Sequence, residues 1–373
     1  MIFKNYHIDY WLLTAVIMLV FIGILTLSGI STSFAQERFG NSYYYLYHQL
    51  VQGILFGFSA AFLFFVIPVS FLKKTAWLLF LVNIVFMVLV FVPGLGINSG
   101  GASRWFDFGF FSFQPSEFLK LTFILYLSVW LSKRYNNFSY KKEGLSKMLL
   151  APFLVILFVI FITLYFQSNA SNCLLFFLIA LLMYFTSETP LSHILIVTAL
   201  FLIVFSIFIL SSSYRMNRIL VLFGQIEDPQ NLSYQIGQSI ITIGSGGIFG
   251  QGIGMSDRKT GGLLPQPMSD SIFAIFAEEA GFVGSFILIS LFLFIIFRCC
   301  IIAKKTNDKF SKIFAVGIGS WISIQAFINI GAVSGIFPLT GIPLPFLSYG
   351  GSHIIAELAG IGLLLNISKS LKK

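Results

Sequence analysis

Charge is scarce in this sequence. Only 10% of its 373 residues are Asp, Glu, Lys or Arg, whereas a typical soluble domain has about 25%. Hydrophobic residues make up 57% of the chain, and Phe alone occupies 45 positions. A soluble globule of this length could not bury so much apolar surface, so the composition excludes one and predicts an integral membrane protein.

Cysteine and histidine are also rare. The three cysteines have neither the spacing of a disulfide framework nor that of a metal site. The four histidines are dispersed, and we assign none of them to a metal. These residues are Cys173, Cys299, Cys300, His7, His48, His193 and His353.

Long apolar runs fill most of the chain. A hydrocarbon core of about 30 Å requires roughly 20 apolar residues in a helix. The runs of that length predict an all-α polytopic membrane protein, a single transmembrane domain over 1–373, with about ten transmembrane helices. The expected spans are 10–30, 48–70, 75–93, 114–132, 149–166, 170–187, 191–213, 270–297, 313–332 and 349–368.

Lys and Arg are distributed unevenly between the two sets of loops. If both termini are cytoplasmic, 16 of the 23 Lys and Arg residues lie in cytoplasmic segments and 6 in outer segments, while Lys120 lies within a span. The positive-inside rule therefore places the N- and C-termini in the cytoplasm. The same bias accounts for most of the net charge of +9, so we expect no nucleic-acid partner.

One outer segment, 214–269 between the seventh and eighth spans, is much longer than the other loops. Loops longer than about 15 residues are usually functional or disordered. Residues 234–241 have helical apolar spacing, and a glycine-rich stretch follows at 244–254. We interpret this large extracytoplasmic loop as a short amphipathic helix followed by a re-entrant turn. A flexible loop is the alternative, and the apolar content argues against it.

The eighth run carries three carboxylates. An ionisable group at bilayer depth costs at least about 2.5 kcal/mol, so each acid is expected to be functional or paired. Asp270 opens the run from the outer side and is a candidate general base, with a plain helix N-cap as the alternative. Glu278 lies roughly 12 Å deeper and needs a partner. Glu279, at the next position around the helix, is expected to face another element.

A second charged group lies on the fourth span, which begins near Gln114. Glu117 and Lys120 share one helix face at a spacing of three residues. We hypothesise that Lys120 neutralises Glu117, Glu278 or both, and that these groups line one polar cavity open to the outside. A buried structural ion pair is the alternative.

Other polar residues are expected around the same cavity. Gln325 and Asn329 lie four residues apart on the ninth span, and Ser348 lies in the Gly- and Pro-rich stretch 331–352. Outer-side cations suit a diphosphate group, and backbone N–H groups of the glycine-rich stretch could approach it. Scattered loop cations are the alternative for each of Arg104, Arg215, Arg218 and Lys259.

Several motifs in fixed order resemble the SEDS family (shape, elongation, division and sporulation), which includes the RodA and FtsW types. The resemblance covers nearly the whole chain. The motifs are Gly101-Ala102-Ser103-Arg104-Trp105, Gln114-Pro115-Ser116-Glu117 with Lys120, Tyr214-Arg215 with Arg218, Tyr234-Gln235 with Gln238-Ser239, Gly244 to Gly254, Asp270 with Ile272-Phe273-Ala274 and Glu278-Glu279, and Gly341 to Gly351.

The resemblance implies a peptidoglycan glycosyltransferase with ten helices in the bacterial cytoplasmic (inner) membrane, polymerising lipid II on the outer face. Its partners would be a class B penicillin-binding protein and the undecaprenyl-linked glycan. Asp270 matches the family's essential aspartate and would act as general base. Glu278, Gln114 and Ser348 would have structural or electrostatic roles, and Phe346 favours the FtsW type.

The resemblance also implies which groups would bind the substrate and its leaving diphosphate. Mg²⁺ or Mn²⁺ is the candidate divalent cation for the diphosphate, with no metal ligand assigned and no other cofactor expected. The implied substrate-binding residues are Arg104, Glu117, Lys120, Arg215, Arg218, Lys259, Gln325 and Asn329.

The chain departs from the family pattern at two places. Where the family usually has Leu-Pro-Glu-x-His-Thr-Asp-Phe, residues 264–271 are Leu-Pro-Gln-Pro-Met-Ser-Asp-Ser. Where many members have Gln-Pro-Asp-x-Gly-Thr, residues 167–172 are Gln-Ser-Asn-Ala-Ser-Asn. Two alternative functions remain open at this point: a lipid II flippase, and a non-catalytic scaffold of the division or elongation machinery.

Overall fold

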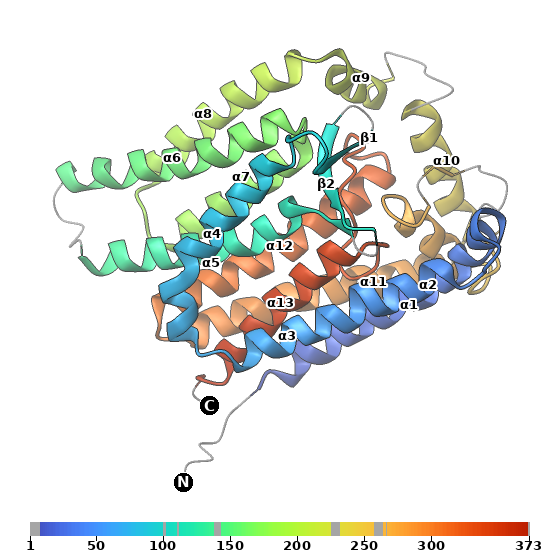
Figure 1. Ribbon diagram of the computed structural model, residues 1–373, viewed down its shortest axis with the longest axis horizontal. Coiled ribbons are helices and arrows are strands. Elements are labelled where there is room, and N and C mark those ends of the chain that lie inside the picture. Colours follow the sequence, from blue (N-terminus) through green and yellow to red (C-terminus); the bar gives the residue numbers. More distant parts are fainter. Residues whose placement is uncertain are drawn as a thin grey trace, which may run out of the picture.

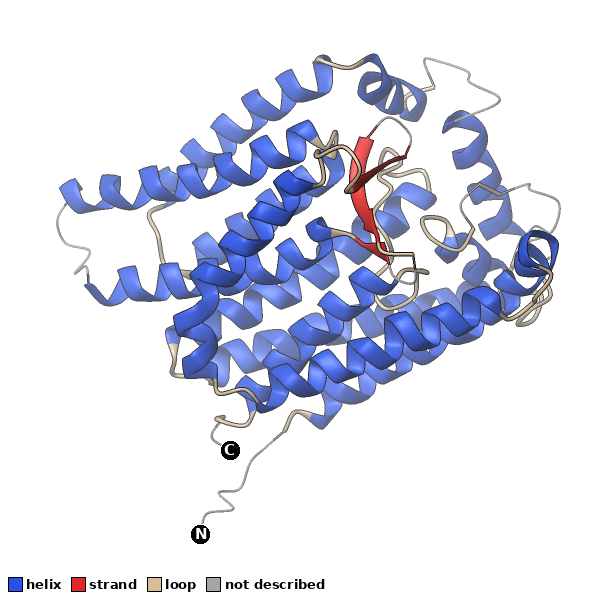
Figure 2. Ribbon diagram, viewed as in Figure 1, coloured by secondary structure: helices blue, strands red, loops and turns tan. Residues whose placement is uncertain are grey.

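The computed structural model describes residues 8–99, 102–109, 112–137, 143–224, 232–256, 264–265 and 267–371. Helices dominate the described chain, and one small sheet lies among them (Figure 2). The elements are α1 Tyr10–Phe39, α2 Tyr44–His48, the π-helix η1 Gln49–Leu55, α3 Phe56–Val66, α4 Val69–Leu89, β1 Gly96–Ser99, β2 Ala102–Asp107, β3 Ser112–Phe113, α5 Pro115–Asn137, α6 Glu143–Phe166, α7 Ala170–Thr186, α8 Leu191–Leu210, α9 Ser213–Leu222, α10 Leu232–Ser245, α11 Ile272–Lys305, α12 Lys309–Val333 and α13 Gly351–Ser368.

Each expected span lies mostly on helical residues, which confirms the all-α polytopic class. Within the described residues, seven stretches are long and apolar enough to cross a membrane, and α6 and α7 contain shorter apolar helices. The fourth expected span lies on α5, where Glu117 and Lys120 interrupt the apolar residues. Ten crossings therefore remain a prediction. The stretches are Tyr10–Thr32, Tyr44–Val66, Val69–Leu89, Leu191–Leu210, Ile272–Lys305, Lys309–Val333 and Gly351–Ser368.

Helices α12 and α13 form the centre of the bundle. In the most apolar stretch of each helix, 78% of the residues of α12 and 83% of those of α13 are buried, against 17% of those of α8. In Figure 1, α8 and α6 lie at the edge of the bundle, while α12 and α13 lie among α1, α3, α5 and α11. The apolar residues that α8 exposes are those expected to face lipid.

Side-chain contacts join segments that the sequence assigns to the same side of the membrane. Successive connections between the helices therefore lie at opposite ends of the bundle, as the Lys and Arg distribution predicts. The contacts are Asp9–Arg298, Lys73–Asp308 and Lys369–Phe65 on the side of the termini, and Gln49–Ser348, Arg104–Gln167 and Arg218–Leu339 on the other.

The small sheet lies at the end of the bundle near α9 and α10 (Figure 1). Its strands pair antiparallel in the order β1-β2-β3, with a register shift between Ile97 and Asn98. The sequence analysis expected no strands here. The sheet fixes the position of Arg104, which lies on β2.

Helix α11 is broken at Gly281, where φ is 67° and ψ is −167°. The break leaves the carbonyl groups of residues 278 and 279 without their helical donors, the N–H groups of residues 282 and 283. The glycine-rich stretch crosses at this point. Its N–H groups at 251 and 252 donate to the two carbonyls at 3.0 Å, and its carbonyls at 247 and 248 accept from the two N–H groups at 2.9 and 3.1 Å. All four groups are thereby paired, as a hydrocarbon environment requires.

This crossing generates a stability prediction. Gly250 has φ +81°, and a Cβ there would lie 2.1 Å from the carbonyl oxygen of Glu279. We expect Gly250→Ala to lower the free energy of unfolding by about 2–5 kcal/mol, because it adds backbone strain and a steric overlap. Gly244→Ala is the matched control, since nothing lies within 4 Å of its Cβ position. Equal thermal unfolding temperatures for the two variants in one detergent would contradict the close packing of the glycine-rich stretch against α11.

Candidate functional site

Asp270 lies in the turn before α11, outside the membrane-spanning stretch that begins at Ile272. The alternative that Asp270 is a plain helix N-cap is wrong: the N-cap is Ser271, whose hydroxyl donates to the carbonyl of Pro265 at 3.1 Å. Asp270 as a residue is partly buried and partly exposed, and its Oδ2 lies 3.6 Å from the position of a Cβ at Gly341. It is therefore available for chemistry.

Three consecutive carbonyl groups fix the backbone of residues 268–270. Asn329 Nδ2 donates to the carbonyl of Asp270 at 3.0 Å. Ser348 Oγ donates to the next carbonyl upstream at 2.6 Å, and the N–H of Tyr349 to the one before it at 2.8 Å. The predicted residues Asn329 and Ser348 thus meet at Asp270. Both are almost fully buried and support its backbone.

Arg218 on α9 is the cation that acts on Asp270. Burial raises the pKa of Asp270, while the positive charge of Arg218 and a hydrogen bond with Ser269 oppose that rise. Arg218 donates to the carbonyl of Leu339 at 2.8 Å and to the hydroxyl of Tyr214 at 2.6 Å. Its Nε has no hydrogen-bond partner among the residues described. This Nε–H is buried, so the donors that hold Arg218 in place are those to Leu339 and Tyr214.

Arg104 lies close enough to Arg218 for the two positive charges to interact. Burial, and secondly the charge of Arg218, lower the pKa of Arg104. Its guanidinium donates to the carbonyls of Gln167 and Ser168, each at 2.8 Å. The segment 167–172, which departs from the family pattern, thus holds one of the predicted cations in place.

Arg215 lies on the same helix as Arg218. It stacks on the ring of Phe208, 4.0 Å from the centroid, and donates to the Phe208 carbonyl at 3.0 Å. The structure therefore gathers three of the four predicted cations at the outer end of the bundle. The fourth, Lys259, lies outside the described residues, as does Gln266.

Lys120 forms a closed polar network instead of lining an open cavity. Its Nζ donates to Glu117 Oε2 and to Gln325 Oε1, both at 2.8 Å, and its side chain is 0% exposed. Trp321 Nε1 also donates to Gln325 Oε1, at 2.7 Å. The predicted pairing with Glu117 is confirmed. The open cavity and the pairing with Glu278 are wrong for this structure, because other hydroxyl groups satisfy Glu278.

Glu278 binds the last residue of α10 and the segment that follows it. Its carboxylate accepts from Ser245 Oγ at 3.0 Å and from Ser256 Oγ. Glu279 faces α1, where a Cβ at Gly29 would lie 3.3 Å from its Oε1. The two carboxylates therefore join the first part of α11 to different neighbours.

The sequence analysis missed Glu357 on α13. This carboxylate is 0% exposed and accepts from Gln325 Nε2 at 3.2 Å and from the N–H of Phe346 at 2.8 Å. His353, one turn earlier, has Nδ1 3.4 Å from Glu357 and Nε2 3.1 Å from the carbonyl of Ser348. A carboxylate within an apolar run was the signal that identified Glu278, and it would have identified Glu357 as well.

Gln114 lies between β3 and α5, next to the start of α13. Its backbone N–H donates to Ser352 Oγ at 3.1 Å. Ser352 Oγ in turn donates to the carbonyl of Ser112 at 3.1 Å. Gln114 therefore links the sheet and α5 to the start of α13, through its backbone.

Comparison with known protein families shows to which family this chain belongs. Residues 10–373 match the family model of FtsW, RodA and SpoVE, described as cell cycle protein. The chain belongs to this family. It is a SEDS protein, and the resemblance predicted from its motifs is confirmed.

Known relatives of this SEDS protein extend over nearly its whole length. Stage V sporulation protein E of Bacillus subtilis (strain 168) is 35% identical over 363 residues, which cover 97% of each chain. A probable peptidoglycan glycosyltransferase FtsW of Wigglesworthia glossinidia brevipalpis is 36% identical over 377 residues, covering 100% of this chain and 96% of the relative. The FtsW relatives support the FtsW-like prediction.

Solved structures share the fold. A chain from work on structural coordination of polymerization and crosslinking by a peptidoglycan synthase complex has a TM-score of 0.78 at 27% identity, covering 97% of both chains. The rod shape determining protein RodA of Thermus thermophilus has a TM-score of 0.72 at 25% identity, covering 99% of this chain and 100% of that one.

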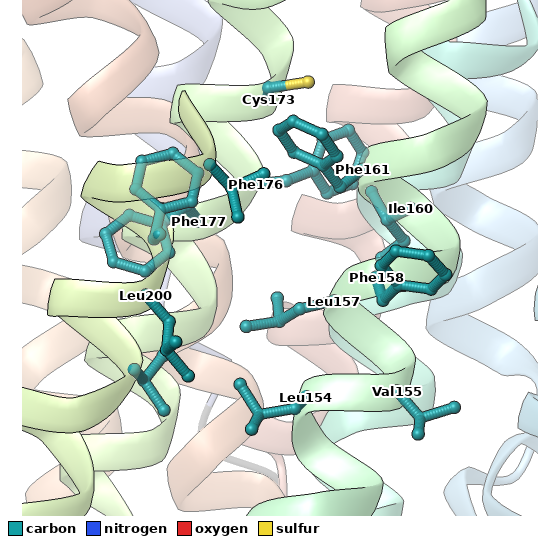
Figure 3. A pocket seen from close by; sticks show the side chains of 13 residues that line it. Leu154, Val155, Leu157, Phe158, Ile160, Phe161, Cys173, Phe176, Phe177 and Leu200 are labelled. Atoms are coloured by element: carbon teal, nitrogen blue, oxygen red, sulfur yellow. The ribbon is translucent and has the colours of Figure 1, made fainter. Parts of the chain in front are cut away.

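The SEDS protein also has an apolar cavity of about 390 Å³ between α6, α7 and α8 (Figure 3). Its lining contains apolar side chains and Cys173. Phe161 lines the cavity and packs edge-on against Phe208, 5.6 Å between centroids, and Arg215 stacks on that second ring. Phe161 in the cavity lining is therefore connected through Phe208 to one of the outer cations, Arg215.

The side chains at this site can be tested for their ability to hold the implied divalent cation. Within the described part of the chain, no group of three or more His, Cys, Asp or Glu side chains could hold a metal. A Mg²⁺ shared with a diphosphate needs only one or two carboxylates, and Asp270 is the carboxylate at this site. The donor set fits a cation held mainly by a substrate and does not fit a protein cage.

The closed network generates a second stability prediction. Lys120→Met would leave Glu117 and Glu357 buried without the lysine, so we expect a loss of about 3–5 kcal/mol in unfolding free energy. Lys73→Met is the control, because the Lys73–Asp308 pair is partly exposed and should contribute at most about 1 kcal/mol. Denaturant unfolding in one detergent measures both.

The same measurement tests the correction concerning Glu278. Because Glu278 and Lys120 have separate partners, the effects of Lys120→Met and Glu278→Gln should add in the double variant. Non-additivity above about 1 kcal/mol would contradict the two separate networks.

Proposed function

We propose that this SEDS protein is a peptidoglycan glycosyltransferase that polymerises lipid II into glycan strands, in cell division or elongation. The observation that carries the proposal is the partly exposed Asp270, positioned by three hydrogen bonds to the carbonyl groups of residues 268–270 and within range of the charge of Arg218. Relatives named as probable peptidoglycan glycosyltransferases support the reaction class.

Asp270 would act as general base on the acceptor sugar. Its carboxylate takes the proton of the 4-hydroxyl group as that oxygen attacks the anomeric carbon of the donor. The bond between the anomeric carbon and the diphosphate oxygen breaks, and undecaprenyl diphosphate leaves with the electron pair. The attack from the opposite face inverts the anomeric configuration.

The arginines would stabilise the charge that develops on the leaving diphosphate. Arg104 and Arg218 lie within range of each other's positive charge at the outer end of the bundle. Preorganised cations of this kind act more strongly in a site shielded from water. A divalent cation bound to the diphosphate would supply additional positive charge, and no step above depends on it.

The apolar cavity suits the hydrocarbon part of a lipid-linked substrate. It lies among membrane helices, and Phe161 in its lining is connected through Phe208 to Arg215. A hydrocarbon chain in the bilayer with its diphosphate at the outer cations satisfies both environments. This supports a site that faces outward from the bacterial cytoplasmic (inner) membrane, as the Lys and Arg distribution predicts.

The partner we propose is a class B penicillin-binding protein. A structural relative comes from work on a peptidoglycan synthase complex that coordinates polymerization and crosslinking. Such a complex would cross-link the glycan strands as they are made. The flippase alternative requires a polar path reachable from both faces, whereas the network of Lys120, Glu117 and Gln325 is closed.

The decisive variant is Asp270→Asn, which keeps the size of the side chain and removes the base. We expect polymerisation of lipid II to fall by about 10²–10⁴-fold, the usual contribution of general-base catalysis. Purified protein is assayed with and without a class B penicillin-binding protein, by gel separation of labelled glycan strands.

Asp107→Asn is the matched control, because Asp107 is an exposed aspartate on β2 at the same end of the bundle. It should keep the activity of the unchanged protein. Polymerisation by Asp270→Asn at the rate of the control variant would contradict the proposal. Transfer of lipid II across vesicles without polymerisation would favour the flippase.

A further inference from the structure

The turn before α13 has an unusual backbone at Phe346. Its φ is +63°, in the left-handed region that a bulky residue seldom adopts, and its side chain is 1% exposed. Helix α1 presses against this turn, since a Cβ at Gly23 would lie 2.7 Å from the Phe346 carbonyl oxygen. Such a conformation persists only where the surroundings hold it in place.

Glu357 is the group that holds Phe346. Its Oε2 accepts the Phe346 N–H at 2.8 Å, while its Oε1 accepts from Gln325 Nε2 at 3.2 Å. Gln325 in turn accepts from Lys120. A carboxylate therefore anchors the strained turn to the buried lysine through one amide.

The turn continues directly to the carbonyls that fix Asp270. Ser348 Oγ accepts from the N–H of Leu344 at 2.8 Å and donates to the carbonyl of Ser269 at 2.6 Å. One hydroxyl thus closes the turn and binds the residue before Asp270. A change in the turn at Phe346 must move this hydroxyl.

We propose that Glu357 is a positioning residue for Asp270, acting through the strained Phe346 turn and the Ser348 hydroxyl. This inference rests on the proposed function of Asp270. It assigns to a carboxylate on the last helix a part in catalysis without contact with the substrate. Its effect should appear in kcat, because the substrate-binding groups stay in place while the base is displaced.

A carboxylate suits this position better than an amide. Gln325 Nε2 and the Phe346 N–H both donate to Glu357, and His353 Nδ1 lies 3.4 Å away. A glutamine has one acceptor oxygen and brings N–H donors of its own. Glu357→Gln therefore keeps the volume of the side chain and cannot satisfy all of these donors.

The first measurement is steady-state polymerisation of lipid II by Glu357→Gln. We expect kcat to fall about ten- to a hundred-fold, as for a small misplacement of a catalytic group, with KM within two-fold. Glu188→Gln is the control, because Glu188 is an exposed carboxylate paired with Lys312 at the other end of the bundle. It should leave both constants unchanged.

The second measurement is amide hydrogen exchange by mass spectrometry on the full chain in detergent. In Glu357→Gln, peptides covering 344–349 and 267–271 should exchange faster, while peptides of α7 stay unchanged. Ser348→Ala removes the link to Ser269 and leaves Glu357 in place. It should speed exchange at 267–271 and lower kcat, and combining it with Glu357→Gln should add little further loss.

The outcomes separate the inference from the proposed function. If Asp270→Asn abolishes polymerisation and folded Glu357→Gln keeps its kcat, the inference is overturned and the function stands. If the unchanged protein makes no glycan, the proposed function fails, and exchange at 267–271 alone decides whether Glu357 controls the Asp270 turn. Faster exchange throughout Glu357→Gln, including α7, would overturn the inference in favour of a general structural role.

Discussion

The hydrogen bonds to three consecutive carbonyl groups at residues 268–270 are the interaction on which the site depends. Irregular backbone at the edge of the hydrocarbon needs internal partners for its polar groups. Asn329 from α12, with Ser348 and Tyr349 from the turn before α13, provides those partners. The most buried helices of the bundle thus determine where the Asp270 carboxylate lies.

The buried charges serve the same arrangement. Lys120 and Glu117 pair within α5, and Gln325 connects the lysine to Glu357 on α13. A separate set of hydroxyl groups satisfies Glu278 next to the break in α11. Charge in this protein is scarce, and Lys120, Glu357 and Glu278 each connect their own helix to another element of the bundle.

Most of the architecture could be predicted from the sequence, because apolar runs of membrane length are local features. Asp270 and the cations Arg104, Arg215 and Arg218 were also accessible, from their chemistry and from family motifs. The partner of Glu278 was not, because it depends on how the glycine-rich stretch crosses α11 at Gly281. The sheet around β2 and the strained Phe346 turn likewise arise from contacts between distant segments. Glu357 was accessible and was missed.

The pH dependence of kcat/KM tests the central claim most directly, namely that Asp270 is a base whose charge Arg218 stabilises. The account predicts that activity falls on the acid side as the Asp270 carboxylate is protonated, at a pH above the ordinary range of an aspartate, because burial raises its pKa. In Arg218→Gln the loss of the cation should raise that pKa further and move the acid limb to higher pH. An acid limb at the same pH in both proteins, or none in either, would contradict the account.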